Sequence, residues 1–380
     1  MIQNSSMSKE RVNRIWLVSV GIGAYILGLL ATRVCEDRQE APEPAPVQIQ
    51  ANVVAPVAAS SVQDDSDLAK AQKRDPRERI PWAEWTKLYE KAPTSEQLEQ
   101  FVEARGRSAE SLVAAASFGK EGAVWLKEAM KKFPDSRLVQ MTALTSDSNL
   151  TANERITWAE RLKQSMPDNA VANILAATAK AATGDLMGSL DELRAVSEQR
   201  KFDDLKSTLA LNRTEALLHA GFNYPEARAL GRPDNAGQFT MQVHETAKAL
   251  KSEFIPTLTG DARDEAIALG LALGNRLSEG DGSGDPAIEL MGMSVEQMFL
   301  SAMNPDERPP FLEMSVEEAK ASVLAQRKVL LENVQNHSGL DSDISEYELL
   351  QFFDRAELLG APAALEWMKQ TRTAESESTK

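Results

Sequence analysis

Histidine and carboxylate pairs come nearest, in this sequence, to a metal or catalytic site. Glu215 and His219 lie four residues apart, so a helix would place both on one face as metal ligands. Two ligands are too few for a zinc site, and the HExxH pattern of zinc proteases does not occur. The motifs of serine hydrolases, P-loops and dinucleotide-binding strands do not occur either. We therefore expect a protein that is not an enzyme and uses no metal or cofactor.

Calcium binding and glycoside hydrolysis are the next chemistries to consider. Asp281, Ser283 and Asp285 match the start of a calcium loop. The sixth position of that loop, however, is Pro286 instead of glycine, and the twelfth is Gly292 instead of glutamate. Glycoside hydrolysis needs two carboxylates at a set distance across a cleft, which spacing along the chain does not show. An envelope enzyme acting on polysaccharide therefore stays an alternative interpretation.

Methionine and phenylalanine gather in the segment that follows this glycine-rich turn. Methionine is flexible and adaptable, and methionine-rich surfaces suit binding to varied partners. The ordinary explanation is packing of a C-terminal lobe, but an exposed stripe here would bind a protein or peptide partner. The candidate partner-binding residues are Met291, Met293, Met298, Phe299, Met303 and Phe311.

The chain is strongly acidic, with a formal net charge of -15. Such a chain repels nucleic acid phosphates, so we expect no nucleic acid partner. The single cysteine, Cys35, excludes an intramolecular disulfide and a cysteine-based zinc site. Its role stays open between an unreactive thiol, an acylation site and an intermolecular disulfide.

An uncharged stretch from Ile15 to Ala31 predicts one transmembrane helix over residues 15–34. Basic residues exceed acidic ones in the preceding segment, so residues 1–14 are expected to form a cytoplasmic tail. These features predict a single-pass protein of the bacterial inner membrane, with the bulk of the chain in the periplasm. A cleaved signal peptide is the alternative, although the Leu-Leu-Ala end of the stretch makes a poor cleavage site.

The rest of the chain has the spacing of amphipathic helices. Apolar residues recur at three and four residues from Ile80 onward, and Thr94 and Ser315 each begin a sequence typical of a capping box. The segment GQFTMQVHE near Gln238 fits a helix as well as a strand. We expect an all-α protein divided as follows: a Pro/Ala-rich linker at 35–75, a helical-repeat-like domain at 76–280, a C-terminal helical lobe at 281–370 and a disordered tail at 371–380.

Two Pro-Asp turns indicate a repeat within the helical body. Phe133-Pro134-Asp135-Ser136 and Met166-Pro167-Asp168-Asn169 lie 33 residues apart, and each precedes a run rich in Ala and Leu. Residues 108–230 therefore resemble the tetratricopeptide repeat family, which stacks helical hairpins into a solenoid. The resemblance assigns close-packing or core positions, and the turn between two helices, to these residues: Gly122, Leu126, Ala129, Ala177, Gly184-Asp185, Ser189 and Leu193.

The sequence also departs from that family at several positions. The aromatic residues of the family's first helix are missing near Asn173 and Lys180, Lys201 replaces the final proline, and Arg155 stands where a small residue belongs. An irregular bundle of helices is thus the alternative to an irregular α-solenoid of tetratricopeptide-like hairpins. The overall plan resembles uncharacterised single-span bacterial envelope proteins.

A binding role follows from these expectations. We expect a membrane-anchored, non-catalytic scaffold or chaperone-like module of the cell envelope, which binds a protein or peptide in a groove between helix pairs. Apart from the polysaccharide enzyme named above, a membrane-anchored signalling regulator is the other alternative.

Overall fold

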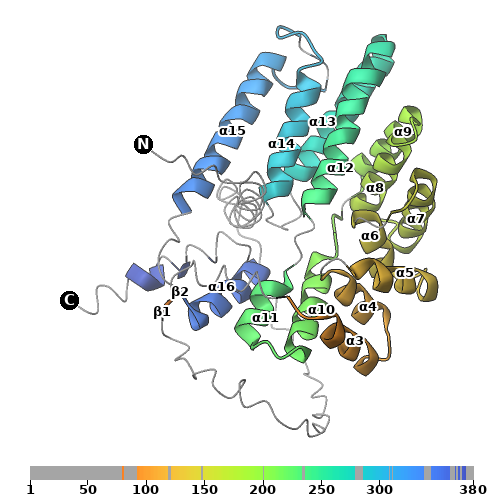
Figure 1. Cartoon of the computed structure of the whole chain (residues 1–380). Coiled ribbons are helices and arrows are strands. Elements are labelled where there is room, and N and C mark those ends of the chain that lie inside the picture. The colour runs from red at the N-terminus through yellow and green to blue at the C-terminus, as the bar shows by residue number, and fades with distance from the viewer. Residues whose placement is uncertain are drawn as a thin grey trace, which may run out of the picture.

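The computed structural model is mostly helical, which confirms the all-α prediction (Figure 1). It describes residues 79–80, 92–118, 121–146, 149–199, 201–232, 236–278, 286–307, 309, 311–337, 344–359, 364, 367–368 and 370–373. The expected cytoplasmic tail, transmembrane helix and linker lie wholly outside these residues.

The prediction of a transmembrane helix before the helical body, and with it the single-pass inner-membrane localisation, is corrected. Among the residues that the structure describes, no helix is both long enough and apolar enough to cross a bilayer. The longest helix in this part of the chain, α15 (Val316–His337), carries several charged residues. Residues 15–34, on which the prediction depended, are outside the described part of the chain.

The first seven labelled helices form a row in which each helix packs against the next in sequence. The ends of α5, α7 and α9 lie 33 residues apart along the chain. Phe133 and Met166 follow α5 and α7 with nearly the same backbone angles, φ −130° and ψ 53° against φ −139° and ψ 62°. The helices of the row are α3 (Ser95–Ala104), α4 (Ala109–Ala116), α5 (Gly122–Lys132), α6 (Arg137–Thr145), α7 (Ala152–Ser165), α8 (Ala170–Ala181) and α9 (Leu186–Glu198).

The small residues expected at close contacts lie where helices cross. Ala177 and Ser189 are fully buried, in α8 and α9, and Leu193 is 1% exposed. Gly184 takes a left-handed φ of +81° in the turn between these helices, and Asp185 caps α9 by accepting the Gly188 N–H at 2.9 Å. The sequence therefore placed this hairpin correctly.

After α9 the chain first packs against the helices at the start of the row and then against those at its end. Helix α10 (Lys206–His219) packs against α3, α4 and α11 (Tyr224–Gly231). Helix α12 (Ala236–Ala249), which continues through a π-helical turn η2 (Leu250–Phe254) and a 3-10 turn η3 (Ile255–Thr257), then packs against α8, while α13 (Gly260–Ser278) packs against α9. The segment near Gln238 is thus helical. It belongs to α12, which packs beside α8 although the two helices are distant in sequence.

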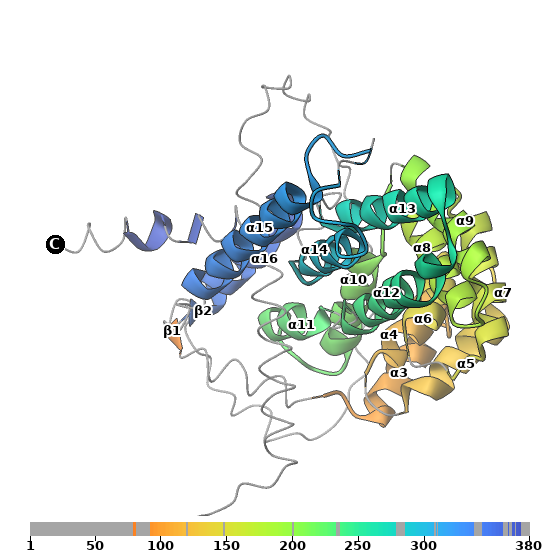
Figure 2. The ribbon, with the colours of Figure 1, turned by 90° about the horizontal axis from the view of Figure 1, so that it is seen from above.

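The C-terminal helices continue this packing (Figure 2). Helix α14 (Pro286–Leu300) lies against α12 and α13, and α15 lies against α14. Helix α16 (Glu346–Leu359) packs against α11, and the short strands β1 (Arg79–Ile80) and β2 (Ile344–Ser345) pair antiparallel beside it. One hydrophobic core contains residues from both sides of the expected domain boundary at 280–281, which itself lies outside the described residues.

Gly122 lies where α5 packs closely against the end of α4. A Cβ atom at this position would overlap the backbone carbonyl of Ala116. Exchanging glycine for alanine in a helix normally stabilises it by up to about 1 kcal/mol. We expect Gly122→Ala to do the opposite and lower the free energy of unfolding by about 1–3 kcal/mol. Urea denaturation checks the sign: a variant that is more stable than the parent would show that the two helices separate easily.

Candidate functional site

The methionine and phenylalanine stripe lies mostly inside the protein. Phe299 is fully buried beside Gly270 of α13, and Met293 and Met303 are 7% and 5% exposed. Met291 and Met298 are half-buried and pack against the core, while Phe311 is 36% exposed. Four of these residues lie on α14, which packs against α12 and α13, and Met303 is buried in the same core, so lobe packing accounts for five of the six. That they bind a partner stays a prediction, and the structure offers a different surface for it.

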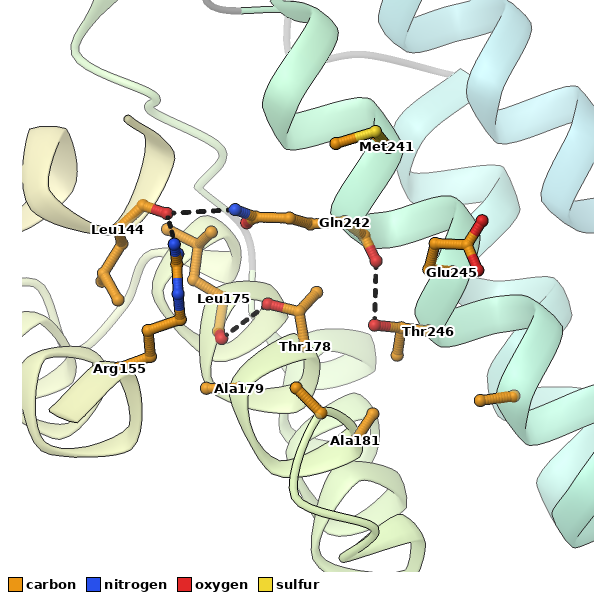
Figure 3. Close-up of a pocket in the computed structure, with 12 residues that line it drawn as sticks. Leu144, Arg155, Leu175, Thr178, Ala179, Ala181, Met241, Gln242, Glu245 and Thr246 are labelled. Atoms are coloured by element: carbon orange, nitrogen blue, oxygen red, sulfur yellow. Dashed lines mark hydrogen bonds between the residues drawn. The ribbon is translucent and has the colours of Figure 1, made fainter. Parts of the chain in front are cut away.

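That surface is a groove of about 430 Å³ between α8 and α12, closed at one end by α6 and α7 (Figure 3). The volume lies within the range of ligand-binding clefts, about 300–1,000 Å³. The groove is mainly apolar, with a few polar groups at its rim. Its lining residues are Leu144, Arg155, Leu175, Thr178, Ala179, Ala181, Ala182, Met241, Gln242, Glu245, Thr246 and Ala249.

The alanine-rich sequence of α8 shapes one wall. Alanine has the highest helix propensity and a side chain of a single methyl group, so this run forms a helix with a smooth face. Ala182 at its end is exposed, and Ala179 beneath is 3% exposed. The hydroxyl of Thr178 donates to the Leu175 carbonyl at 2.8 Å, so it turns back to its own helix. This wall therefore presents mainly carbon atoms.

Helix α12 forms the opposite wall. Met241 is 59% exposed, although methionine is usually buried. Thr246 donates its hydroxyl to the Gln242 carbonyl at 2.9 Å, as Thr178 does on the other wall. Glu245 is exposed at the rim. Two helical walls thus face one another with apolar groups between them and a carboxylate at one edge.

The end of the groove contains the C-terminus of α6. The Leu144 carbonyl accepts two hydrogen bonds, from Arg155 Nη1 at 2.9 Å and from Gln242 Nε2 at 3.2 Å (Figure 3). A guanidinium group beside the last carbonyls of a helix also interacts favourably with its dipole. These two bonds join α6, α7 and α12 at one atom. The sequence analysis did not predict this site; Arg155 was noted there only as a departure from the repeat pattern, which was the one signal that could have indicated it.

The described lining of the groove contains one carboxylate, Glu245, whereas hydrolysis of a glycoside uses two. Within the described ranges, no cluster of three or more His, Cys, Asp or Glu residues is arranged to hold a metal ion. Glu215 forms an ion pair with Arg105, and the His219 ring packs 5.8 Å from the ring of Phe101, so both have structural contacts.

A buried polar network lies on another face of α8. Glu192 of α9 is 5% exposed and accepts hydrogen bonds from Lys163 at 2.8 Å, Lys180 at 2.5 Å and the Asn173 amide at 2.7 Å. Gln199 in turn donates to the Asn173 side-chain oxygen at 2.8 Å. Asn173 and Lys180 lie near the positions where the tetratricopeptide repeat pattern has aromatic residues. Here polar contacts hold α7, α8 and α9 together.

The network lowers the pKa of its carboxylate. Burial by itself would raise the pKa of Glu192, but the hydrogen bonds and positive charges of Lys163 and Lys180 outweigh it and lower the pKa below 4.5. Burial would likewise lower the pKa of Lys163, and the Glu192 carboxylate raises it above 10.5. The Glu192 carboxylate and the Lys163 ammonium group are therefore both charged at neutral pH, and their contacts hold α8, one wall of the groove, to α7 and α9.

Comparison with protein-family models, with curated proteins and with solved structures finds no match to this chain.

Proposed function

We propose that the protein is a non-catalytic binding scaffold that holds a peptide segment of another protein in the groove between α8 and α12. The observation that carries this proposal is the apolar groove itself, whose walls expose Met241 and Ala182 to solvent. Helical scaffolds often bind segments of partners in such grooves by burying apolar side chains.

We also propose that the hairpins are degenerate members of the tetratricopeptide type. The 33-residue spacing of the ends of α5, α7 and α9 and the buried small residues Ala177 and Ser189 support this assignment. The return of α10 to α3 and α4 departs from a regular solenoid, in which each repeat contacts only its neighbours.

The polysaccharide enzyme has less support. Each carboxylate with a shifted pKa in the described part of the chain has it lowered, by hydrogen bonds or ion pairs. A general acid in a glycosidase needs a raised pKa. The scaffold is therefore the better account of the groove.

A variant that fills the groove tests the scaffold directly. Peptides selected from a random library on the full-length protein are expected to lose binding to Ala182→Trp by at least about tenfold, since the indole occupies their space. Ala182 is exposed, so the fold tolerates the larger side chain. Fluorescence anisotropy measures the affinity of each selected peptide for parent and variant.

The matched control is Ala325→Trp, the same substitution at an exposed position of α15. This variant should bind the selected peptides like the parent. A library that yields no binder, or binders that the two variants hold equally well, would overturn the proposed function.

A further inference from the structure

The groove also indicates what kind of segment it holds. We propose that its occupant is a short amphipathic α-helix, with an acidic side chain opposite Arg155 and a basic side chain opposite Glu245. This inference rests on the proposed function and specifies the partner more narrowly.

The helical form of the occupant follows from the walls. In α8 and at its C-cap, the lining residues Leu175, Thr178, Ala179 and Ala182 recur at the spacing of one helical face. In α12, Gln242, Glu245 and Ala249 do the same. Backbone groups inside an α-helix are bonded within it, so these walls offer no ladder of donors and acceptors to an extended strand. A helix that satisfies its own backbone suits such walls.

The size of the groove fits about two helical turns. The lining of α12 extends from Met241 to Ala249, a rise of roughly 12 Å at 1.5 Å per residue. Small side chains on α8 allow another helix to approach closely, because the distance between two helix axes depends on the side chains at the contact. The occupant should therefore present small or medium apolar side chains at three- and four-residue spacing.

Arg155 supplies the charge preference at one end. Its side chain lines the groove, and its Nη1 atom is bonded to the Leu144 carbonyl (Figure 3). A guanidinium group has five N–H donors, so donors remain for a ligand. Within the described residues no carboxylate forms an ion pair with Arg155. A carboxylate from a partner would accept a charge-assisted hydrogen bond from the half-buried Arg155 guanidinium group.

Glu245 supplies the opposite preference on α12. Its ion pair with Lys248 is long, at 3.8 Å, and both side chains are more than 60% exposed, so it contributes little. Since the cation lies at the closed end of the groove, on α7, and the carboxylate lies on the α12 wall, they favour one direction of a charged helix over the other. Charge complementarity of this kind gives specificity more than affinity.

Arg155 also has a structural role, because it caps α6. A purely structural role would change stability when Arg155 is replaced, but it would not change which peptide charges are preferred. The test therefore reads the charge preference at each peptide position, and thermal unfolding of each variant is measured beside it.

The probe is a library of short, stapled helices with a constant alanine and leucine face and randomised charged positions. Selection on the full-length parent should enrich Asp or Glu at one position and Lys or Arg at another. Selection on Arg155→Glu should enrich Lys or Arg at the first position, and selection on Glu245→Lys should enrich acid at the second. Exchanging the enriched acid for glutamine should weaken binding to the parent about tenfold.

Glu245→Lys is the variant least able to disturb the fold, because Glu245 is exposed. Arg327→Glu, at an exposed position of α15, is the matched charge control and should leave every preference unchanged. One outcome would overturn the inference and leave the scaffold intact. In it, the selected helices bind the parent but not Ala182→Trp, while Arg155→Glu and Glu245→Lys select the same charges as the parent. A selection that yields no stapled helix would also overturn the inference, and the random peptide library then shows separately whether the scaffold holds.

Discussion

Replacing Glu192 by alanine is expected to lower the free energy of unfolding by about 3–5 kcal/mol, the usual loss when one member of a buried ion pair is removed. The change leaves Lys163 and Lys180 near one another without their shared anion, and it leaves the Asn173 amide without its acceptor. Urea denaturation at neutral pH measures the loss. A change below about 1 kcal/mol, the size typical of exposed ion pairs, would contradict this account.

A triple variant separates charge from packing at the same place. Glu192→Leu combined with Lys163→Met and Lys180→Met removes all three charges and keeps their approximate volume. Apolar replacement of a whole buried ion pair is often neutral or stabilising, because the cost of burying charge disappears with the charges. The triple variant should therefore regain most of the stability that Glu192→Ala loses.

The pH dependence of this network has a definite sign. The pKa of Glu192 is lowered in the folded protein, so its stabilisation is present above the ordinary value of 4.5 and declines as the pH falls below it. The difference in stability between the parent and Glu192→Ala should thus shrink in acid. The difference should also shrink at strongly alkaline pH, because the raised pKa of Lys163 makes its contribution disappear above 10.5.

Replacing Glu348 by alanine is the second large effect, at about 2–4 kcal/mol. The Glu348 side chain is 7% exposed and binds two arginines from distant parts of the chain. Arg79 of β1 donates at 2.9 and 3.1 Å, Arg372 donates at 2.9 Å, and the Ser345 backbone N–H donates at 2.9 Å. The effect is smaller than at Glu192 because Arg79 is 40% exposed and keeps part of its hydration.

Loss of Glu348 should act locally as well as globally. Hydrogen exchange is expected to increase at Arg79–Ile80 and at residues 370–373, since this carboxylate joins both segments to α16. Helices α4 to α9 should keep their protection. Glu332→Gln, which removes an exposed partner of Lys328 at 3.7 Å, is the control and should change stability by less than about 0.5 kcal/mol.

The stability that Glu348 gives also depends on pH. Burial would raise its pKa, but the Ser345 N–H and the two arginines outweigh burial and lower the pKa to about 2. The contribution is therefore complete above 4.5 and disappears progressively as the pH falls from 4.5 towards about 2. Equal acid sensitivity of the parent and Glu348→Ala would contradict this linkage.

These predictions bear on the proposed function because α8 belongs to both the groove and the Glu192 network. Lys180 and Asn173 hold one face of α8 to α9, while Ala179 and Ala182 line the groove on another. A preorganised wall loses little conformational entropy when a peptide binds. We therefore expect Glu192→Ala to weaken peptide binding although it touches no peptide.

Local features of the fold were accessible from the sequence. Thr94 and Ser315 begin helices with the expected reciprocal bonds to Gln97 and Glu318, and Gly184 makes the turn between α8 and α9. Caps, turns and amphipathic spacing depend on residues a few positions apart, so a single sequence contains them. The methionine stripe illustrates the limit: composition identified it, but burial depends on which helices cover it.

The sequence by itself determined that this chain forms helices and where several of them begin and end, because those choices are made by neighbouring residues. Only the tertiary structure decided that α10 returns to α3 and α4, that α12 comes to face α8, and that Arg155 and Glu245 line one groove. Such contacts join residues far apart in the chain, and their free energy depends on complementary surfaces and on satisfied polar groups. No local pattern encodes these properties, so the groove appears only when the helices are packed together.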